Sequence, residues 1–210
     1  MSTNLEEVLL RPRQCAADWL VIHARDLADL AKRTNSMTLL VFACLEARNA
    51  IEQLWCEILM VLHGGTISRK LFEKCRRRRD GFLAAIGDAE CRYRQLSRFT
   101  MIAMSLDSQA PCSGVAWDLA HLKRMWHSLS EYCHAQANPA ATLADLKWIA
   151  AAYALIEELF TYFQQEMSQG VTAILCPEKM TVAARMIWEG FAAGNIDEEQ
   201  VTIRLRIVQP

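Results

Sequence analysis

The amino-acid sequence predicts an all-α fold, a multi-helix bundle of long antiparallel helices with one short C-terminal β-strand. Hydrophobic residues make up 52% of the 210 residues, whereas glycine and proline number 8 and 5, a composition typical of long helices joined by short turns. A chain of this length can bury a sizeable core. We expect a helical bundle domain over residues 1–170 and a C-terminal extension over residues 171–210, a helix and a strand packed on the bundle.

The longest apolar stretch runs from Met37 to Leu62 and predicts a buried core helix. Asn35-Ser36 provides an N-cap ahead of it, and Gly64-Gly65 ends it. Four charged residues within the stretch are too many for an ordinary membrane span, so we expect no membrane association. They are Glu46, Arg48, Glu52 and Glu57.

A basic helix, or a pair of helices, is expected from about Ser68 to Leu106, with a cap within residues 66–68. Gly81 and Gly87 weaken the helical pattern within it. The pattern stops at Pro111-Cys-Ser-Gly114, which is typical of a loop.

Two further helices follow this loop. The first carries His127 and His134 and ends at Asn138-Pro139, because the residue before a proline disfavours the α region. Thr142 caps the second, which reaches about Gln169. Apolar residues recur along it at near-helical spacing, which indicates that its aromatic side chains face a core and do not form a stacking surface.

The chain after Gly170 is predicted to form a shorter helix, to about Ala193, and then one strand. Val201 to Val208 alternates apolar residues with Thr or Arg, which is the pattern of a strand. A lone strand exposes unpaired backbone donors and acceptors, so it needs a partner. We expect that partner to be the segment Val8-Leu-Leu10 or the same strand in a second copy of the chain, within a two-fold homodimer.

Positive charge is concentrated in one part of the chain. Ten Lys/Arg and four acids lie between Arg69 and Arg98, an excess of six, so the remainder carries −7 and the total is −1. Such a segment can attract a polyanion such as RNA, although it is also consistent with a solvated helix face, because four consecutive arginines point all round a helix. The predicted RNA-binding residues are Arg76, Arg77, Arg78, Arg79, Arg92 and Arg94.

Motifs for several other kinds of chemistry are missing from the sequence. The eight cysteines are scattered singly, which signals neither a zinc site nor a redox dithiol, and Cys44, Cys56 and Cys133 lie among apolar neighbours as small hydrophobic residues do. Glu131-x-x-His134 is only half of a four-helix carboxylate metal site. No phosphate loop, Gly-x-Ser-x-Gly elbow or His-Glu-x-x-His motif occurs. We therefore expect no metal and no cofactor.

A secretory signal has a basic region followed by an apolar region, and the N-terminal residues contain neither. A cytoplasmic location is therefore expected.

Histidines, hydroxyls and a carboxylate recur at helical spacing in the segment from Arg124 to Ala135. Successive helical residues are rotated by about 100°, so His127 and His134, seven apart, return to one face. Lys123 and Ser130 lie on the same face, with Glu131 at its edge. The opposite, apolar stripe comprises Leu122, Trp126, Leu129 and Cys133.

The core helix contributes a second polar group. Arg48 and Glu52 are four residues apart and can pair along the helix. Buried polar groups need partners, so this pair either satisfies itself or lines one polar groove together with His134.

Two short segments, Leu45-Glu-Ala-Arg-Asn-Ala-Ile-Glu52 and Leu129-Ser-Glu-Tyr-Cys-His134, resemble the HEPN superfamily of small prokaryotic helical domains. The resemblance covers roughly residues 36–169 and implies a role in a toxin–antitoxin or phage-defence system. Catalytic members use an Arg and a His, with four to six residues between them, as a metal-independent endoribonuclease site, usually across a dimer interface. Here His127, with six residues between it and His134, stands in the place of the arginine, and nine residues separate Arg124 from His134.

This departure from the motif favours RNA binding without cleavage, because arginine is always cationic whereas an ordinary histidine is mostly neutral at pH 7. If the chain does cleave RNA, the base and the acid are His134 and His127, and Arg48 or Arg124 supplies the cation in a groove that includes Glu52. The alternative is a non-enzymatic helical module for dimerisation or protein interaction.

Overall fold

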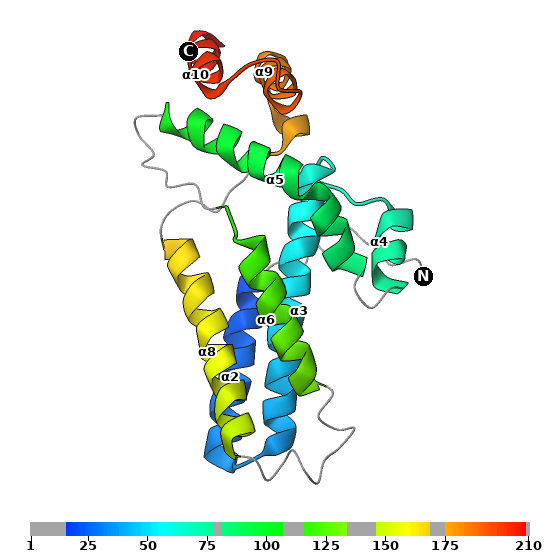
Figure 1. The fold of residues 1–210 in the computed structure, drawn as a ribbon, viewed down its shortest axis with the longest axis vertical. Coiled ribbons are helices and arrows are strands. Elements are labelled where there is room, and N and C mark those ends of the chain that lie inside the picture. The colour runs from blue at the N-terminus through cyan, green and yellow to red at the C-terminus, as the bar shows by residue number, and fades with distance from the viewer. Residues whose placement is uncertain (1–15, 78–80, 107–115, 134–145, 169–174, 209–210) are drawn as a thin grey trace. The chain divides into compact units, whose positions relative to one another are not determined.

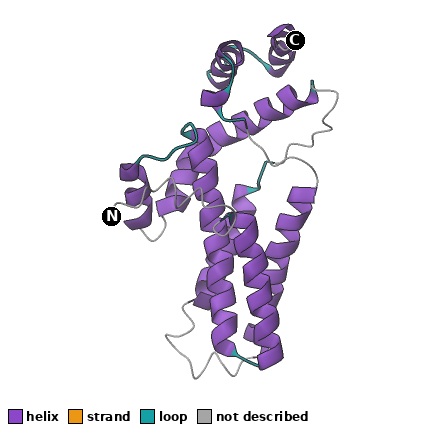
Figure 2. Ribbon diagram, turned by 180° about the vertical axis from the view of Figure 1, so that it is seen from behind, coloured by secondary structure: helices purple, strands orange, loops and turns teal. Residues whose placement is uncertain are grey.

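The computed structural model describes residues 16–77, 81–106, 116–133, 146–168 and 175–208, and every regular element within these residues is a helix (Figures 1 and 2). The predicted all-α class is therefore confirmed. The elements are α2 (Ala17–Thr34), α3 (Met37–Leu62), α4 (Arg69–Arg77), α5 (Gly81–Ser105), α6 (Leu119–Cys133), α8 (Leu146–Ser168), the 3-10 turn η2 (Pro177–Lys179), α9 (Val182–Ala192) and α10 (Glu198–Val208). Among them, no helix has both the length and the apolar character of a membrane span.

These helices form two compact units. Unit 1 comprises residues 1–54 and 118–165, and unit 2 comprises residues 55–117 and 166–210. The predicted boundary at residue 170 lies near residue 165, where the chain leaves unit 1, but unit 2 also contains the residues from the end of α3 to the start of α6. The second unit is thus assembled from two separate stretches of the chain.

Unit 1 is a bundle in which α2, α6, α8 and the N-terminal part of α3 lie side by side with alternating directions (Figures 1 and 2). The buried stripe of α2 is made of small residues at helical spacing, which allows a close approach of its neighbours. These residues are Ala17, Val21, Ala24, Ala28 and Ala31. Larger side chains complete the core from the other helices, among them Leu40, Ile51, Leu122, Leu129, Ile156 and Leu159.

Local sequence signals set the turn between α2 and α3. Asn35 adopts a left-handed conformation, with φ of 50°, and ends α2. The backbone N–H of Ser36 donates to the Ala31 carbonyl at 3.0 Å, while the Ser36 hydroxyl accepts from the Leu39 N–H at 3.4 Å. The predicted cap therefore divides into two roles, because Asn35 closes one helix and Ser36 opens the next.

In unit 2, Gly64 and Gly65 end α3, with φ of 84° and 88°. These left-handed conformations suit glycine, and the Gly65 N–H donates to the Met60 carbonyl at 2.7 Å. Ser68 then caps α4 by accepting from the Leu71 N–H at 3.2 Å. The predicted basic helix pair is α4 and α5. A Cβ atom at Gly81, the first residue of α5, would collide with the Cys75 carbonyl, so the close approach of α4 and α5 there requires glycine.

The C-terminal helices α9 and α10 pack on α5 and on each other (Figure 1). Phe99 of α5 is fully buried, with its ring centroid 5.6 Å from that of Trp188 and 6.3 Å from that of Phe191, both on α9. Val201 and Leu205 bury the inner side of α10. The aromatic cluster thus joins the last part of the chain to the rest of unit 2.

The predicted C-terminal strand over Val201 to Val208 is wrong, because these residues lie in α10. Asp197 and Gln200 form a reciprocal capping box. The Gln200 N–H donates to Asp197 Oδ1 at 2.9 Å, and the Asp197 N–H donates to Gln200 Oε1 at 3.1 Å. This cap nucleates a helix, and Val201 and Leu205 then share its buried side at i, i+4 spacing. The proposed strand partner, Val8 to Leu10, lies outside the described residues.

Candidate functional sites

In unit 1, Arg48 and Glu52 pair along α3, and Trp126 of α6 completes the cluster. Arg48 Nη2 lies 2.8 Å from Glu52 Oε1, and Trp126 Nε1 donates to the same oxygen at 2.8 Å. The Arg48 guanidinium carbon lies 4.8 Å from the centroid of the Trp126 ring, as in a cation–π contact. One carboxylate and one indole therefore hold the guanidinium from two sides.

Arg48 also acts electrostatically on the thiol of Cys133, at the end of α6. Burial raises the pKa of this thiol and Arg48 opposes the rise, so the thiol stays protonated near neutral pH. The Arg48 side chain is 18% exposed, and its Nε atom is buried without a hydrogen-bond partner among the described residues. These contacts are those of a structural cluster, in which the arginine is largely withdrawn from solvent.

The polar face predicted for α6 is only partly present. His127 and Lys123 are exposed, but Ser130 is buried and its hydroxyl donates to the Trp126 carbonyl at 2.7 Å. A serine can turn its hydroxyl back onto the preceding helical turn and so enter a core that its spacing alone does not predict. The apolar stripe is confirmed for Leu122, Trp126 and Leu129.

The five predicted catalytic residues do not all come together in the described part of the chain. Arg48 and Glu52 are in contact, whereas neither His127 nor Arg124 forms a hydrogen bond or an ion pair with them among the described residues. His134 lies outside the described residues.

A second polar cluster of unit 1, at the start of α6, was not identified from the sequence. Arg124 Nη2 lies 3.4 Å from His121 Nδ1. Arginine only donates, so Nδ1 is the acceptor and the ring proton sits on Nε2, 3.8 Å from Glu158 Oε1. The His121 ring also contacts the Tyr162 ring edge to face, at 4.7 Å between centroids. Both ring nitrogens of His121 therefore face protein partners.

Asp118 caps α6 beside this cluster. Its carboxylate accepts from the His121 N–H at 2.9 Å, a bond that lowers the pKa of Asp118, and its own N–H donates to the Tyr162 hydroxyl at 2.9 Å. An Asp three residues before His121 is a recognisable N-cap signal in the sequence. The contacts from α8 have no such signal, since they depend on packing.

The predicted role of two cysteines as core residues is confirmed. Cys44 and Cys56 are buried, and burial raises the pKa of each thiol to about 12. Neither thiol is a ready nucleophile or metal ligand. Within the described residues, no group of three or more His, Cys, Asp or Glu side chains is arranged to hold a metal ion.

In the basic segment of unit 2, the structure separates paired cations from unpaired ones. Arg69 and Arg77 share Glu73, at 3.0 and 3.4 Å, on the surface of α4. On α5, Arg94 pairs with Glu90 at 2.5 Å, and Arg98 pairs with Glu198 of α10. Among the described residues, Lys70, Lys74 and Arg92 are exposed and have no acidic partner. Arg78, Arg79 and the Arg76 side chain lie outside the described part of the structure.

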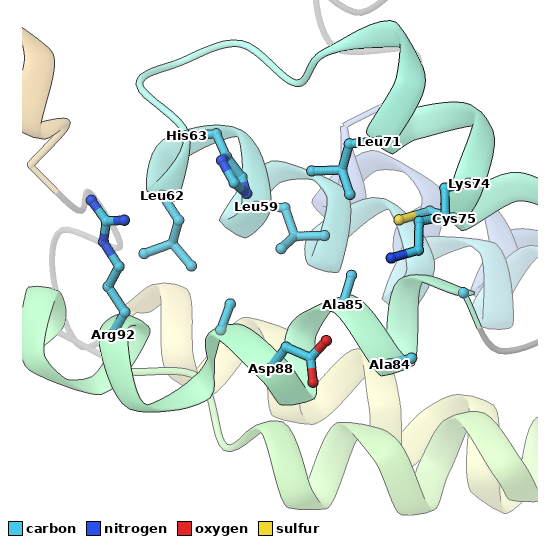
Figure 3. Close-up of a pocket in the computed structure, with 12 residues that line it drawn as sticks. Leu59, Leu62, His63, Leu71, Lys74, Cys75, Ala84, Ala85, Asp88 and Arg92 are labelled. Atoms are coloured by element: carbon cyan, nitrogen blue, oxygen red, sulfur yellow. The ribbon is translucent and has the colours of Figure 1, made fainter.

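A cleft of about 360 Å³ lies in unit 2 between the end of α3, α4 and the first half of α5 (Figure 3). Leucine and alanine side chains form much of its lining, and four polar side chains lie among them. The polar residues are His63, Lys74, Asp88 and Arg92.

Comparisons with protein-family models, with the sequences of curated proteins and with solved structures found no match.

Proposed function

We propose that this chain is an RNA-binding protein that lacks nuclease activity and contacts RNA phosphates mainly through α4. The observation that carries the proposal is the charge of this helix, which has five Lys/Arg and one acid within nine residues. Glu73 partly neutralises Arg69 and Arg77, but Lys70 and Lys74 have no acidic partner among the described residues. Exposed cations of this kind release counterions from a nucleic acid when they bind it.

The contacts of the two polar clusters in unit 1 argue for binding without cleavage. Metal-free cleavage needs a base, an acid and a cation at the reacting phosphate. Arg48 is held by Glu52 and Trp126, and the two ring nitrogens of His121 face Arg124 and Glu158. On the HEPN resemblance, we infer that the protein belongs to a prokaryotic defence or toxin–antitoxin system as a catalytically degenerate member.

The first prediction concerns salt-dependent RNA binding. We expect the protein to bind single-stranded or structured RNA at low salt, with log affinity falling linearly against log salt concentration. The double variant Lys70→Gln/Lys74→Gln loses two phosphate contacts, so the slope should shrink by about 2. Filter binding across a salt series measures both quantities.

The matched control is Arg33→Gln/Lys123→Gln, which removes two exposed cations from unit 1. We expect it to keep the wild-type slope. A wild-type protein that binds no RNA at low salt would end the proposal, and an equal loss in the control would show that α4 is not the contact.

The outer face of α10 favours a second candidate function, a homodimerising interaction module. Glu199, Ile203, Arg206 and Ile207 recur at the spacing of one helix face, opposite to Val201 and Leu205. Ile203 and Ile207 are 51% and 77% exposed. In an antiparallel pair whose two-fold axis passes between residues 202 and 203, Glu199 of one copy faces Arg206 of the other, so the face is complementary to itself. We infer that a second copy of this chain is its partner.

Charge reversal tests this contact better than deletion of α10, because deletion also removes the buried Val201 and Leu205. We expect Glu199→Arg to shift a dimer to monomer by opposing Arg206, and Glu199→Arg/Arg206→Glu to restore the dimer. Sedimentation equilibrium at several concentrations measures the mass, and circular dichroism checks that the helices remain. A wild-type monomer throughout would remove the dimer, and an unchanged dimer in the single variant would assign it to another face.

A further inference from the structure

The apolar part of the cleft in unit 2 is built by three helices. Leu59 and Leu62 come from the last turns of α3 and are almost completely buried, while Leu71 and Cys75 come from α4. The α5 side is lined by alanines, including Ala85, and such small side chains leave space that larger ones would fill. The cleft therefore has apolar walls, between which a hydrocarbon group can bind.

Polar side chains come to this space from all three helices or their ends (Figure 3). His63 follows α3, Lys74 lies on α4, and Arg92 lies on α5. Asp88 is the one acid among the described residues that line the cleft. Two fixed cations and a histidine thus outnumber one carboxylate.

The cations at the cleft differ from the other arginines of the same segment whose side chains the structure describes. Arg69, Arg77, Arg94 and Arg98 all have a carboxylate partner. In contrast, the side chains of His63, Lys74, Asp88 and Arg92 form no hydrogen bond or ion pair within the described residues. Positive charge beside an apolar wall attracts an anion more strongly than it does in bulk water, because the wall lowers the local dielectric response.

We propose that this cleft binds a small organic anion with an aliphatic body and a carboxylate or phosphate head. The leucine and alanine walls would take the aliphatic body, and the Arg92 guanidinium offers the planar fork that suits either head. Lys74 lies at the other end of the cleft and adds to its positive charge (Figure 3). The volume lies at the lower end of the range for small-molecule pockets. Among the described lining residues there is no Phe, Tyr or Trp, so the site lacks the stacking surface that a nucleobase uses. The inference does not depend on RNA binding.

Isothermal titration calorimetry of the full chain with four probes separates the contribution of the aliphatic body from that of the charged head. Octanoate and octyl phosphate carry both the body and a head, octanol carries only the body, and acetate carries only a head. We expect one site for octanoate, for octyl phosphate or for both, with octanol and acetate binding at least about tenfold more weakly. Tighter binding of octanoate would identify a carboxylate as the head group, and tighter binding of octyl phosphate would identify a phosphate. Absence of binding by both at millimolar concentration would overturn the proposal.

Three variants assign the binding to the cleft. Arg92→Gln should weaken the bound probe about tenfold or more by removing the charged donor. Ala85→Phe should abolish binding by filling the space, with circular dichroism and thermal unfolding confirming that it folds. Lys70→Gln is the matched control, since Lys70 is exposed on α4, lacks an acidic partner among the described residues and does not line the cleft. Wild-type affinity in both Arg92→Gln and a folded Ala85→Phe would overturn the inference.

The same control separates this inference from the proposed function. Lys70→Gln should weaken RNA binding and leave octanoate or octyl phosphate binding unchanged. A protein that binds no RNA but binds a probe in the Arg92-dependent manner would retain the cleft inference and lose the RNA proposal.

Discussion

Replacement of Glu52 by Ala is expected to lower the free energy of unfolding by about 2–3 kcal/mol, because it leaves a largely buried cation without its counter-ion. Arg48 is 18% exposed at its side chain, and Glu52 Oε1 also accepts from Trp126 Nε1. The variant therefore removes an ion pair and a hydrogen-bond acceptor together. Urea unfolding followed by circular dichroism measures the loss.

Two comparison variants separate these contributions. Glu52→Gln keeps an acceptor for Trp126 but removes the charge, so it should cost less than Glu52→Ala. Arg48→Met/Glu52→Leu replaces the pair by apolar side chains, and it should be more stable than Glu52→Ala because no unpaired charge remains. A double variant as unstable as the sum of its single variants would show that Arg48 and Glu52 are not coupled. That result would return both residues to the list of candidates for a functional groove.

Replacement of Phe99 by Ala is expected to destabilise unit 2 by about 3–5 kcal/mol, the usual cost of removing a buried aromatic ring. Phe99 is 0% exposed and contacts Trp188 and Phe191, so its loss opens a cavity where α9 and α10 pack on α5. We expect amide hydrogen exchange to accelerate most in α9 and α10. Exchange measured by mass spectrometry resolves each helix, which a single unfolding midpoint does not.

Phe42→Ala provides the control for this experiment. Phe42 belongs to unit 1 and is 49% exposed, so its truncation should leave exchange in α9 and α10 unchanged. If Phe99→Ala accelerates exchange equally in α2 and α10, the two units do not unfold separately. If it leaves α9 and α10 protected, the aromatic cluster is not what holds them on α5.

Helix ends could be predicted from the sequence where a local signal sets them. Ser36, Gly65 and Ser68 were placed correctly, because a cap needs only a suitable residue within a few positions of the backbone groups that it satisfies. The wrong prediction of a strand over Val201 to Val208 also concerns a local signal. Those residues fit a period of two, but Asp197-x-x-Gln200 directly before them forms a capping box, and α10 follows from it.

The sequence by itself determined the all-α class, several helix ends and the clustering of positive charge, since these depend on composition and on short-range spacing. Only the tertiary structure decided which charges are neutralised. Arg98 meets Glu198, 100 positions later, and Trp126 meets Glu52, 74 positions earlier, whereas Lys74 and Arg92 both line one cleft without an acidic partner among the described residues. Such pairings depend on how helix faces pack, which the spacing along one helix does not specify.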